Sequence, residues 1–297
     1  MSLPVTIIGG YLGAGKTTLV NHLLRHANGL RIAVLVNEFG TLPIDADLIE
    51  AEDGQMISIA GGCVCCAYGD DMAAAMMDLL ALDPRPDHVV LEASGVALPA
   101  SIAGTVSLLQ GFSVDGIVVL ADAETAQKNA NHKFMGDTVT RQLSQADLVV
   151  LNKTDLVQDL GAVTGFVATQ TQATVIRATQ GQVPPTVLLQ SFPDTTLSGP
   201  AHAASYYRTL ALPADPPMDP QTVAKALAGA DLNLLRAKGF VQDASGQRYA
   251  IQCVARRAAY EKAAPDAPLG LVAIGLSDTF DEPKIRAALI TATLIDA

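Results

Sequence analysis

The most specific pattern in this chain is GYLGAGKT, residues Gly10–Thr17. It fits the pattern G-x-x-x-x-G-K-[ST], in which glycines let the backbone wrap so that successive N–H groups point at phosphate oxygens. The apolar run Val5–Gly10 before it is typical of a strand, and Lys16–His26 after it is typical of a helix. The N-terminus of that helix favours anions through its dipole. The sequence therefore predicts a phosphate-binding loop, or P-loop, between a strand and a helix.

Two side chains of this loop carry its chemistry, while Gly10, Gly13, Ala14 and Gly15 supply the enclosing backbone. We expect the ammonium of Lys16 to reach the β- and γ-phosphates and the hydroxyl of Thr17 to ligate Mg²⁺. The alternative is a glycine-rich turn that carries a lysine by accident. We adopt the phosphate interpretation because the motif and its strand–helix context agree.

The rest of the first half alternates apolar strand-like runs with helix-like segments. Continuous apolar strands separated by helices are typical of a parallel sheet covered on both faces, which predicts an α/β domain. The expected strands are 31–40, 56–62, 88–95, 115–122, 146–155 and 173–179, and the expected helices are 70–82 and 133–145.

The pattern changes after residue 191. The segment 192–205 is rich in Pro, Gly, Ser and Thr and is typical of a linker. Residues 206–297 mix strand-like runs with helices near 220–228 and 282–294, and residues 243–246 have turn chemistry. The run 249–258 reads as a single strand. We therefore expect a nucleotide-binding domain over 1–191, a linker, and a smaller α+β domain with an antiparallel sheet over 206–297.

Composition excludes several classes of protein. Of 297 residues, 49% are apolar and 16% charged, which excludes a disordered chain. The formal net charge of −11 argues against nucleic acid as a partner, since phosphate neutralisation needs clustered Lys and Arg. No apolar run approaches the roughly 18–20 residues that span a bilayer, and the N-terminus lacks a positively charged leader. The expectation is a cytoplasmic protein without a membrane partner.

The tetrapeptide Asn152-Lys153-Thr154-Asp155 follows an apolar strand and indicates the nucleotide. A carboxylate at Asp155 accepts hydrogen bonds from the N1–H and 2-amino groups of guanine, and adenine lacks that donor pair. Its position downstream of a P-loop favours GTP over ATP. The alternative is an ordinary polar exit from a strand.

Three of the four cysteines, Cys63, Cys65 and Cys66, fall within four positions. Neighbours that close rarely pair as disulfides, and thiolates suit Zn²⁺, Co²⁺ or Cu⁺. His88 is the nearest histidine that could add a fourth ligand. A redox relay or three buried small side chains are the alternatives. Cys253 lies in a strand-like run and is expected in a core.

Taken together, GGYLGAGKTT, VNEFG followed by Ile44-Asp45, GGCVCC, EASG and NKTD resemble, in this order, the CobW-like family of metal-trafficking P-loop GTPases. The resemblance covers nearly the whole chain and is most specific up to Asp155. It implies a GTP-hydrolysing metallochaperone, with slow intrinsic turnover, that delivers Zn²⁺, Co²⁺ or a related ion to a client protein. A homodimer is the family-level expectation.

The resemblance also implies roles for individual residues. Cys63, Cys65 and Cys66 match the family's C-x-C-C metal motif. Glu92 stands at the position of a Walker B carboxylate near Mg²⁺, and Glu38 lies with Asp45 in a segment that matches a switch loop. Glu38 and Glu92 are candidates for orienting the attacking water, and Glu38 is also a candidate metal ligand. The family's phosphate and guanine contacts match residues at the two motifs described above. These residues are Gly13, Gly15, Lys16, Thr17, Thr18, Asn152, Lys153 and Asp155.

Two other functions fit parts of the sequence. One is a small-molecule kinase that uses the P-loop, and the N-K-T-D element argues against it. The other is a metal-binding module that activates a client with negligible GTP turnover. In the favoured mechanism, GTP–Mg²⁺ orders the segment from Glu38 to Asp45, the cysteines hold the metal, and hydrolysis releases it.

Overall fold

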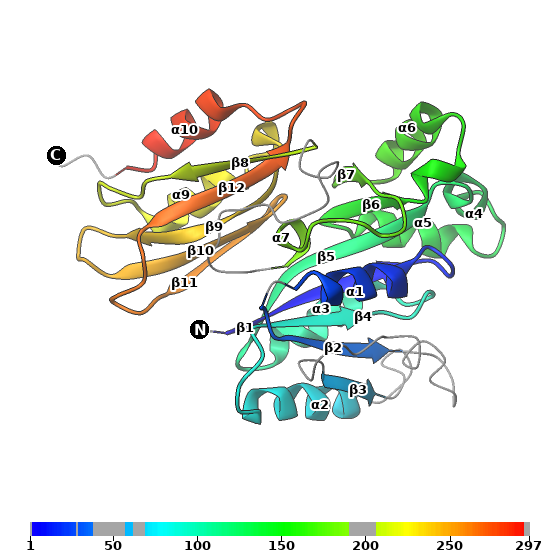
Figure 1. Cartoon of the computed structure of the whole chain (residues 1–297), viewed down its shortest axis with the longest axis horizontal. Coiled ribbons are helices and arrows are strands. Elements are labelled where there is room, and N and C mark those ends of the chain that lie inside the picture. Colours follow the sequence, from blue (N-terminus) through cyan, green and yellow to red (C-terminus); the bar gives the residue numbers. More distant parts are fainter. Residues whose placement is uncertain (1, 28, 38–56, 62–68, 190–205, 294–297) are drawn as a thin grey trace. The chain divides into compact units, whose positions relative to one another are not determined.

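The computed structural model describes residues 2–27, 29–37, 57–61, 69–189 and 206–293. The chain divides into two compact units, Ser2–Ser191 and Phe192–Ala297 (Figure 1). Each unit has its own sheet and its own apolar core, and each is described by itself below.

The first unit is built on a seven-stranded sheet in the order β3-β2-β4-β1-β5-β6-β7, and every strand pair is parallel. The strands are β1 (Leu3–Gly10), β2 (Ile32–Asn37), β3 (Ile57–Gly61), β4 (His88–Glu92), β5 (Phe112–Asp122), β6 (Leu148–Asn152) and β7 (Thr174–Arg177). β1, β4 and β6 are buried along their whole length, which explains their unbroken apolar runs.

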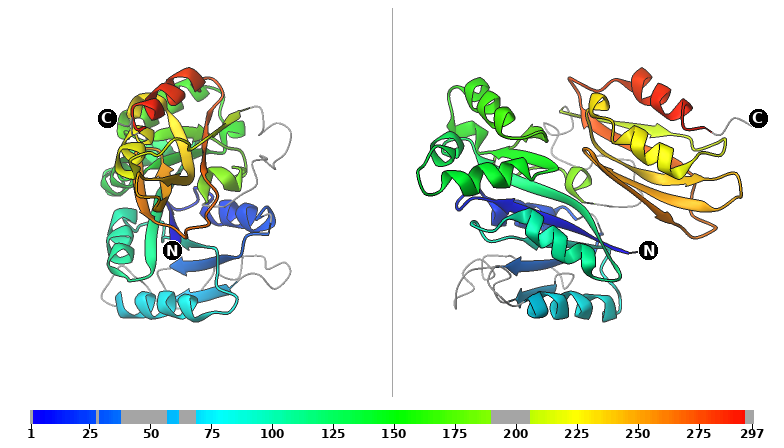
Figure 2. Two further views of the ribbon diagram at one scale, coloured as in Figure 1. Left: turned by 90° about the vertical axis from the view of Figure 1, so that its left-hand side faces the viewer. Right: turned by 180° about the vertical axis from the view of Figure 1, so that it is seen from behind.

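Helices cover both faces of this sheet (Figure 2). Apolar residues of α2, α3, α5 and α6 join the core under one face, whereas α1 and α7 lie against the other. The helices are α1 (Lys16–Arg25), α2 (Gly69–Ala81), α3 (Pro99–Leu108), α4 (Ala126–Ala130), α5 (Gly136–Ser144), α6 (Leu160–Gln170) and α7 (Pro185–Leu188). The predicted α/β architecture with a mostly parallel, helix-covered sheet is confirmed.

The second unit is an antiparallel five-stranded sheet in the order β11-β10-β9-β12-β8. Two helices pack on one face, and their apolar residues share a core with that sheet. Its elements are β8 (Tyr207–Leu212), α9 (Pro220–Leu227), β9 (Leu234–Gln242), β10 (Arg248–Val254), β11 (Arg257–Lys262), β12 (Gly270–Leu276) and α10 (Glu282–Ile290). The predicted α+β domain with an antiparallel sheet is confirmed, and Cys253 is buried in its core.

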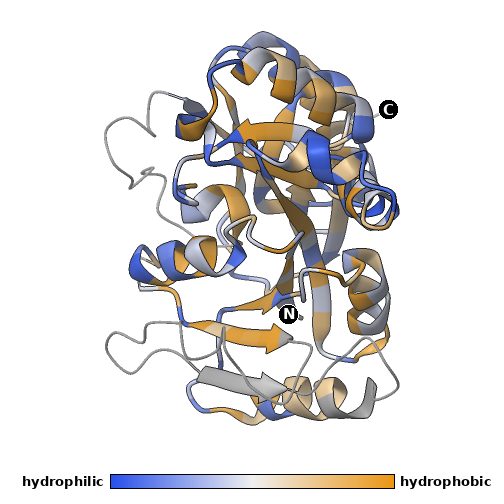
Figure 3. Cartoon of the chain, turned by 90° about the vertical axis from the view of Figure 1, so that its right-hand side faces the viewer, coloured by the Kyte–Doolittle hydropathy of each residue, from blue (hydrophilic) through white to orange (hydrophobic). Residues whose placement is uncertain are grey.

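Aspartate side chains at the ends of these elements accept hydrogen bonds from backbone amides. Asp219 caps α9 by accepting a hydrogen bond from the Thr222 amide, and Asp281 caps α10 in the same way. The predicted turn at 243–246 joins β9 to β10, with Asp243 accepting hydrogen bonds from the Ser245 and Gln247 amides. Figure 3 shows the apolar residues concentrated along the strands.

One local prediction is wrong. Residues 249–258 do not form a single strand, because β10 ends at Val254 and β11 begins at Arg257. The turn between them places Ala255 at φ 48°, a left-handed conformation that glycine or asparagine usually marks. The sequence therefore carries no turn signal at the point where the chain reverses.

Within the part of the chain that the structure describes, no helix combines the length and the apolar character needed to cross a membrane.

Candidate functional site

The P-loop leaves β1 and enters α1 as the motif requires. Gly10 adopts φ 134° and Gly15 φ 97°, both in the region that favours glycine. A Cβ on Gly10 would meet the backbone of Leu120 on β5, and one on Gly15 would meet the side-chain amide of Asn152. Only glycine fits at these two points, because the loop lies close to the ends of β5 and β6.

The side chains of Lys16 and Thr17 face the loop and β4, respectively. Lys16 is only 8% exposed, and its Nζ donates a hydrogen bond to the carbonyl oxygen of Gly10 at 3.0 Å. The ammonium is thereby folded across the loop. Such a buried cation in a glycine-rich loop suits a phosphate group, which carries negative charge and accepts several hydrogen bonds.

Thr17 and Glu92 come together although they are 75 residues apart. The hydroxyl of Thr17 donates a hydrogen bond to Oε1 of Glu92 at 3.1 Å. Glu92 is the last residue of β4 and is 2% exposed. A hydroxyl and a carboxylate are hard oxygen donors of the kind that Mg²⁺ prefers, so the two side chains fit the predicted magnesium site.

Asn152 ties the loop to the opposite side of the site. Its amide nitrogen donates to the carbonyl oxygen of Ala14 at 3.0 Å, and its amide oxygen accepts from the backbone N–H of Gly181 at 2.9 Å. Asn152 is 1% exposed at the end of β6. One side chain therefore fixes the P-loop, the end of β6 and the segment after β7 in a single arrangement.

Lys153 and Asp155 continue from that point in different directions. Lys153 has a left-handed backbone, with φ 59° and ψ 36°, and its Nζ lies 2.7 Å from Oδ2 of Asp122. Asp155 lies on a short 3-10 helix (Thr154–Leu156) and is exposed. The carboxylate that is predicted to read guanine thus remains accessible to a ligand.

Sequence reasoning missed two contributors to this site. The first is the segment Ala178–Gly181 after β7, whose Ala178 carbonyl accepts hydrogen bonds from both the amide and the hydroxyl of Thr154. The second is Asp122, which ends β5 as Glu92 ends β4. A charged residue that closes an apolar strand was the available signal for Asp122, and Gly181 was the only comparable signal for the segment.

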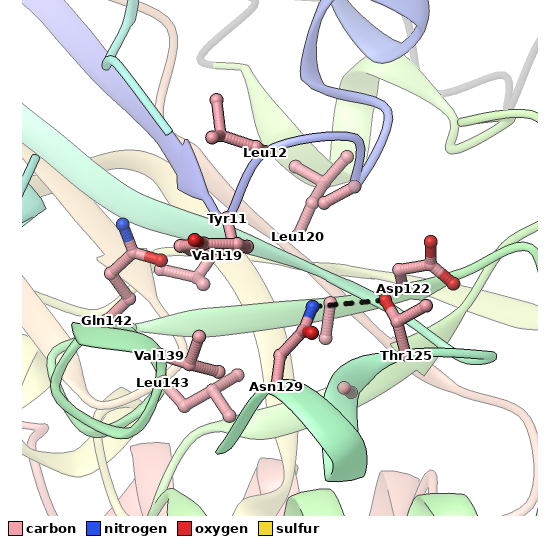
Figure 4. Close-up of a pocket in the computed structure, with 13 residues that line it drawn as sticks. Tyr11, Leu12, Val119, Leu120, Asp122, Thr125, Asn129, Val139, Gln142 and Leu143 are labelled. Carbon is pink, nitrogen blue, oxygen red and sulfur yellow. Dashed lines mark hydrogen bonds between the residues drawn. The ribbon is translucent and has the colours of Figure 1, made fainter. Parts of the chain in front are cut away.

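A small pocket lies beside the P-loop, between β5 and the helices α4 and α5 (Figure 4). Figure 4 shows Tyr11 and Leu12 on one side of it and Val139, Gln142 and Leu143 on the other. The amide of Gln142 donates to the carbonyl oxygens of Gly95 and Ala97, at 3.1 and 2.8 Å. Gln142 therefore links α5 to the segment that follows Glu92.

Comparison with known families identifies both units. A family model described as the CobW/HypB/UreG nucleotide-binding domain matches residues 4–180. A second model, the cobalamin synthesis protein CobW C-terminal domain, matches residues 207–293. The chain belongs to the CobW family. The resemblance inferred from the motifs is therefore confirmed over both units.

Three relatives of this CobW-family chain illustrate its range. It is 32% identical to a zinc chaperone CobW from a Sinorhizobium species, over 97% of this chain and 96% of the relative. It is 36% identical to the zinc chaperone YjiA of Escherichia coli over about half of each chain, 52% and 50%. It is also 36% identical to the zinc-regulated GTPase metalloprotein activator 1 of Schizosaccharomyces pombe, over 52% of this chain and 40% of that one.

Four of the residues predicted to bind a metal, namely Glu38, Cys63, Cys65 and Cys66, fall outside the described residues, as does Asp45 of the predicted switch loop. The described residues that precede them are Asn37, which ends β2, and Gly61, which ends β3, and these two are partners in the sheet. Within the described ranges, no group of three His, Cys, Asp or Glu side chains could hold a metal ion.

His88, named above as a possible fourth ligand, lies in the buried interior of the first unit. It begins β4, whereas the cysteines follow the carboxyl end of the parallel strand β3. It is fully buried, with Nε2 2.8 Å from the hydroxyl of Thr6 and 3.9 Å from the carboxylate of Asp115. His88 thus belongs to a buried polar cluster at the amino end of the sheet.

His22 lies on α1, one turn beyond the P-loop. It is buried, and its ring stands 4.3 Å from that of His26, measured between centroids. Burial, followed by the charge of His26, lowers the pKa of His22 to about 4. The folded chain therefore holds this ring neutral at pH values where the unfolded chain protonates it.

We expect acidification to destabilise the chain through His22. Between pH 6.5 and about 4 the unfolded state binds a proton that the native state does not, so stability falls as the pH falls, by about 2 kcal/mol for this one group. Urea unfolding of the wild type and of His22→Gln at pH 7.5 and 5.0 measures the effect, and the variant should show the smaller loss. The exposed His132→Gln serves as the control. Equal losses in wild type and His22→Gln would contradict the assignment.

Proposed function

We propose that this chain is a GTP-hydrolysing metallochaperone that binds a thiophilic divalent metal, Zn²⁺ or Co²⁺, and transfers it to a client metalloprotein. The observation that carries the nucleotide part is the bridge made by Asn152. Because one buried side chain joins the P-loop carbonyl of Ala14 to the N-K-T-D element, a phosphate site and a base site belong to one rigid arrangement. That is the geometry a nucleoside triphosphate requires.

Guanine is the base that the exposed carboxylate suits. Asp155 can accept hydrogen bonds from two adjacent N–H donors of guanine, whereas adenine offers no such pair at the equivalent edge. Thr17 and Glu92 would hold Mg²⁺, which would supply positive charge to neutralise the phosphates. Lys16, Thr17 and Glu92 are the proposed catalytic residues within the described site, with Glu38 as a further candidate.

The metal site is proposed on Cys63, Cys65 and Cys66, with Glu38 as a candidate further ligand. Glu38 directly follows β2, and Cys63 comes two residues after β3. These two strands are neighbours and end at the edge of the sheet where Glu92 ends β4. The residues proposed to bind the nucleotide and those proposed to bind the metal therefore follow or end strands at the same edge of the sheet. This supports coupling between nucleotide binding and metal binding.

The names of the relatives favour zinc as the cargo and a metalloprotein as the client. Two are called zinc chaperones, and the relative from Schizosaccharomyces pombe is called a zinc-regulated GTPase metalloprotein activator. Three thiolates suit both Zn²⁺ and Co²⁺. We infer that GTP holds the metal-binding state and that loss of the γ-phosphate lowers metal affinity for transfer.

Metal titration in the presence of different nucleotides tests this coupling. We expect a non-hydrolysable GTP analogue to raise Co²⁺ or Zn²⁺ affinity about tenfold over GDP, because a typical coupling between sites lies in this range. Metal should tighten binding of the analogue by the same factor. Anaerobic titration followed by the thiolate-to-Co²⁺ absorption band measures both quantities.

Two variants make this titration specific to the cysteine loop. Cys65→Ser should lose the absorption band and the coupling, whereas Cys253→Ala, which removes the cysteine buried in the second unit, should retain both. Identical metal affinity with the GTP analogue, with GDP and without nucleotide would contradict a GTP-driven metallochaperone.

A further inference from the structure

Asp122 lies at the centre of contacts that the P-loop motifs do not explain. It ends β5, its register partner on β6 is Asn152, and it lines the pocket beside the P-loop together with Tyr11 and Ala14 (Figure 4). We propose that Asp122 is a positioning residue for guanine recognition, which acts through Lys153 on Asp155. The inference rests on the proposed GTP-binding function and deepens it.

Both oxygens of the Asp122 carboxylate are engaged. Oδ2 lies 2.7 Å from Nζ of Lys153, and Oδ1 accepts a hydrogen bond from the backbone N–H of Glu124 at 2.9 Å. The Asp122 side chain is 10% exposed, so solvent competes little for it. A carboxylate fixed at both oxygens on a central strand is a rigid anchor for the lysine.

The backbone conformation at Lys153 explains why this residue needs an anchor. Its left-handed conformation, φ 59° and ψ 36°, is one that a residue with a Cβ seldom adopts. The turn sends the side chain of Asn152 inward to Ala14 and directs Thr154 to the carbonyl of Ala178. Of the four residues of the motif, only Asp155 is left facing solvent on a single turn of helix.

Holding Lys153 also protects Asp155 from a competitor. Lys153 stands only two residues before Asp155 in the sequence. The Asp155 carboxylate must accept hydrogen bonds from guanine, and the ammonium of Lys153 would compete for it. The pair with Asp122 keeps that ammonium on β5 instead. If the Asp122 charge is removed, the freed ammonium can turn to Asp155 and occupy the oxygens that the base needs, and the strained turn loses one of its supports.

The effect should therefore be selective for the base. Guanine engages Asp155 through its N1–H and its 2-amino group, whereas hypoxanthine lacks the 2-amino group and depends on Asp155 less. Misalignment of Asp155 should cost GDP more than IDP. A pair that only stabilised the fold would weaken both nucleotides equally and lower the melting temperature.

Equilibrium binding of GDP and IDP to full-length variants tests the inference. Asp122→Asn keeps the size of the side chain and is expected to weaken GDP binding about tenfold, while it lowers the preference for GDP over IDP. The double variant with Lys153→Met should bind GDP no more weakly than Lys153→Met alone, because Asp122 acts through that lysine.

Asp87→Asn is the matched control. Asp87 also pairs with a cation, Arg31, at 2.8 Å and also accepts a backbone N–H, but it stands at the amino end of the sheet. It should leave the affinity for GDP and the preference over IDP unchanged. Unaltered GDP and IDP binding by Asp122→Asn, or an equal loss for both nucleotides, would overturn the role of Asp122. A wild-type chain that bound no GDP would instead overturn the proposed function.

Discussion

Replacement of Lys16 by alanine should reduce GTP hydrolysis by at least about 100-fold, the loss typical of removing one preorganised charge from a transition state. The ammonium is already folded across the P-loop onto the carbonyl of Gly10 and is nearly buried. It is therefore positioned before any ligand arrives, and no neighbouring cation of the loop can replace it. Phosphate release measured with saturating GTP, Mg²⁺ and metal gives the turnover.

The same variant distinguishes the functions that the sequence left open. If nucleotide chemistry drives delivery, Lys16→Ala should also abolish GTP-dependent transfer of metal to a client or a chelator. Lys128→Ala, an exposed lysine on α4, should keep both activities. Metal transfer that survived in Lys16→Ala would favour a client-activating module without GTP turnover. A small-molecule kinase would transfer the γ-phosphate to an acceptor, so the release of free phosphate without an acceptor would exclude that function.

The central strands of the first unit were predictable because β1, β4 and β6 are buried along their whole length. The runs expected at 115–122 and 146–155 have continuous apolar centres, 117–121 and 148–151, and these centres lie in β5 and β6. α1 was predictable for the same reason, since it begins at the lysine of the P-loop and buries Leu19 and Leu23. Where burial and a local motif agree, the sequence alone determines the element.

Other elements carry no such signal. α3 carries no charged residue and its only polar side chains are small hydroxyls, so no strong helical period stands out in Pro99–Leu108. α6 contains two glycines, which disfavour a helix. Its N-terminus is nevertheless fixed by a hydrogen bond from the Ala162 amide to the side chain of Asp159. Here packing against the sheet outweighs local preference.

The residues of the candidate site also divide into those that the sequence predicts and those that it does not. The members of one contiguous motif, Gly10–Thr17, were predictable from spacing. The contacts that join motifs were not, because they depend on strand order: β5 lies beside both β1 and β6, and this brings Asp122 to Lys153. The place of His88 also depends on the fold, because it begins β4 at the end of the strand opposite to Glu92.

The base preference gives the second large effect. Asp155→Asn should weaken GTP binding by at least about 100-fold, because a site built to accept hydrogen bonds from a base discriminates strongly once an acceptor becomes a donor. The same change should favour XTP, whose carbonyl at C2 can accept a hydrogen bond from the new amide. Competition between GTP and XTP for the wild type and the variant measures both changes.

The surroundings of Asp155 should allow this substitution to change base recognition without changing the rest of the site. The side chain is exposed and the turn that carries it is held by Asn152 and Thr154, so the substitution should leave the P-loop and the melting temperature unchanged. Asp159→Asn, another exposed aspartate in the same segment, should bind GTP as the wild type does. If Asp155→Asn kept its preference for GTP, the base would have to be read by another residue. The segment Ala178–Gly181, which contacts both Asn152 and Thr154, would then be the first place to look.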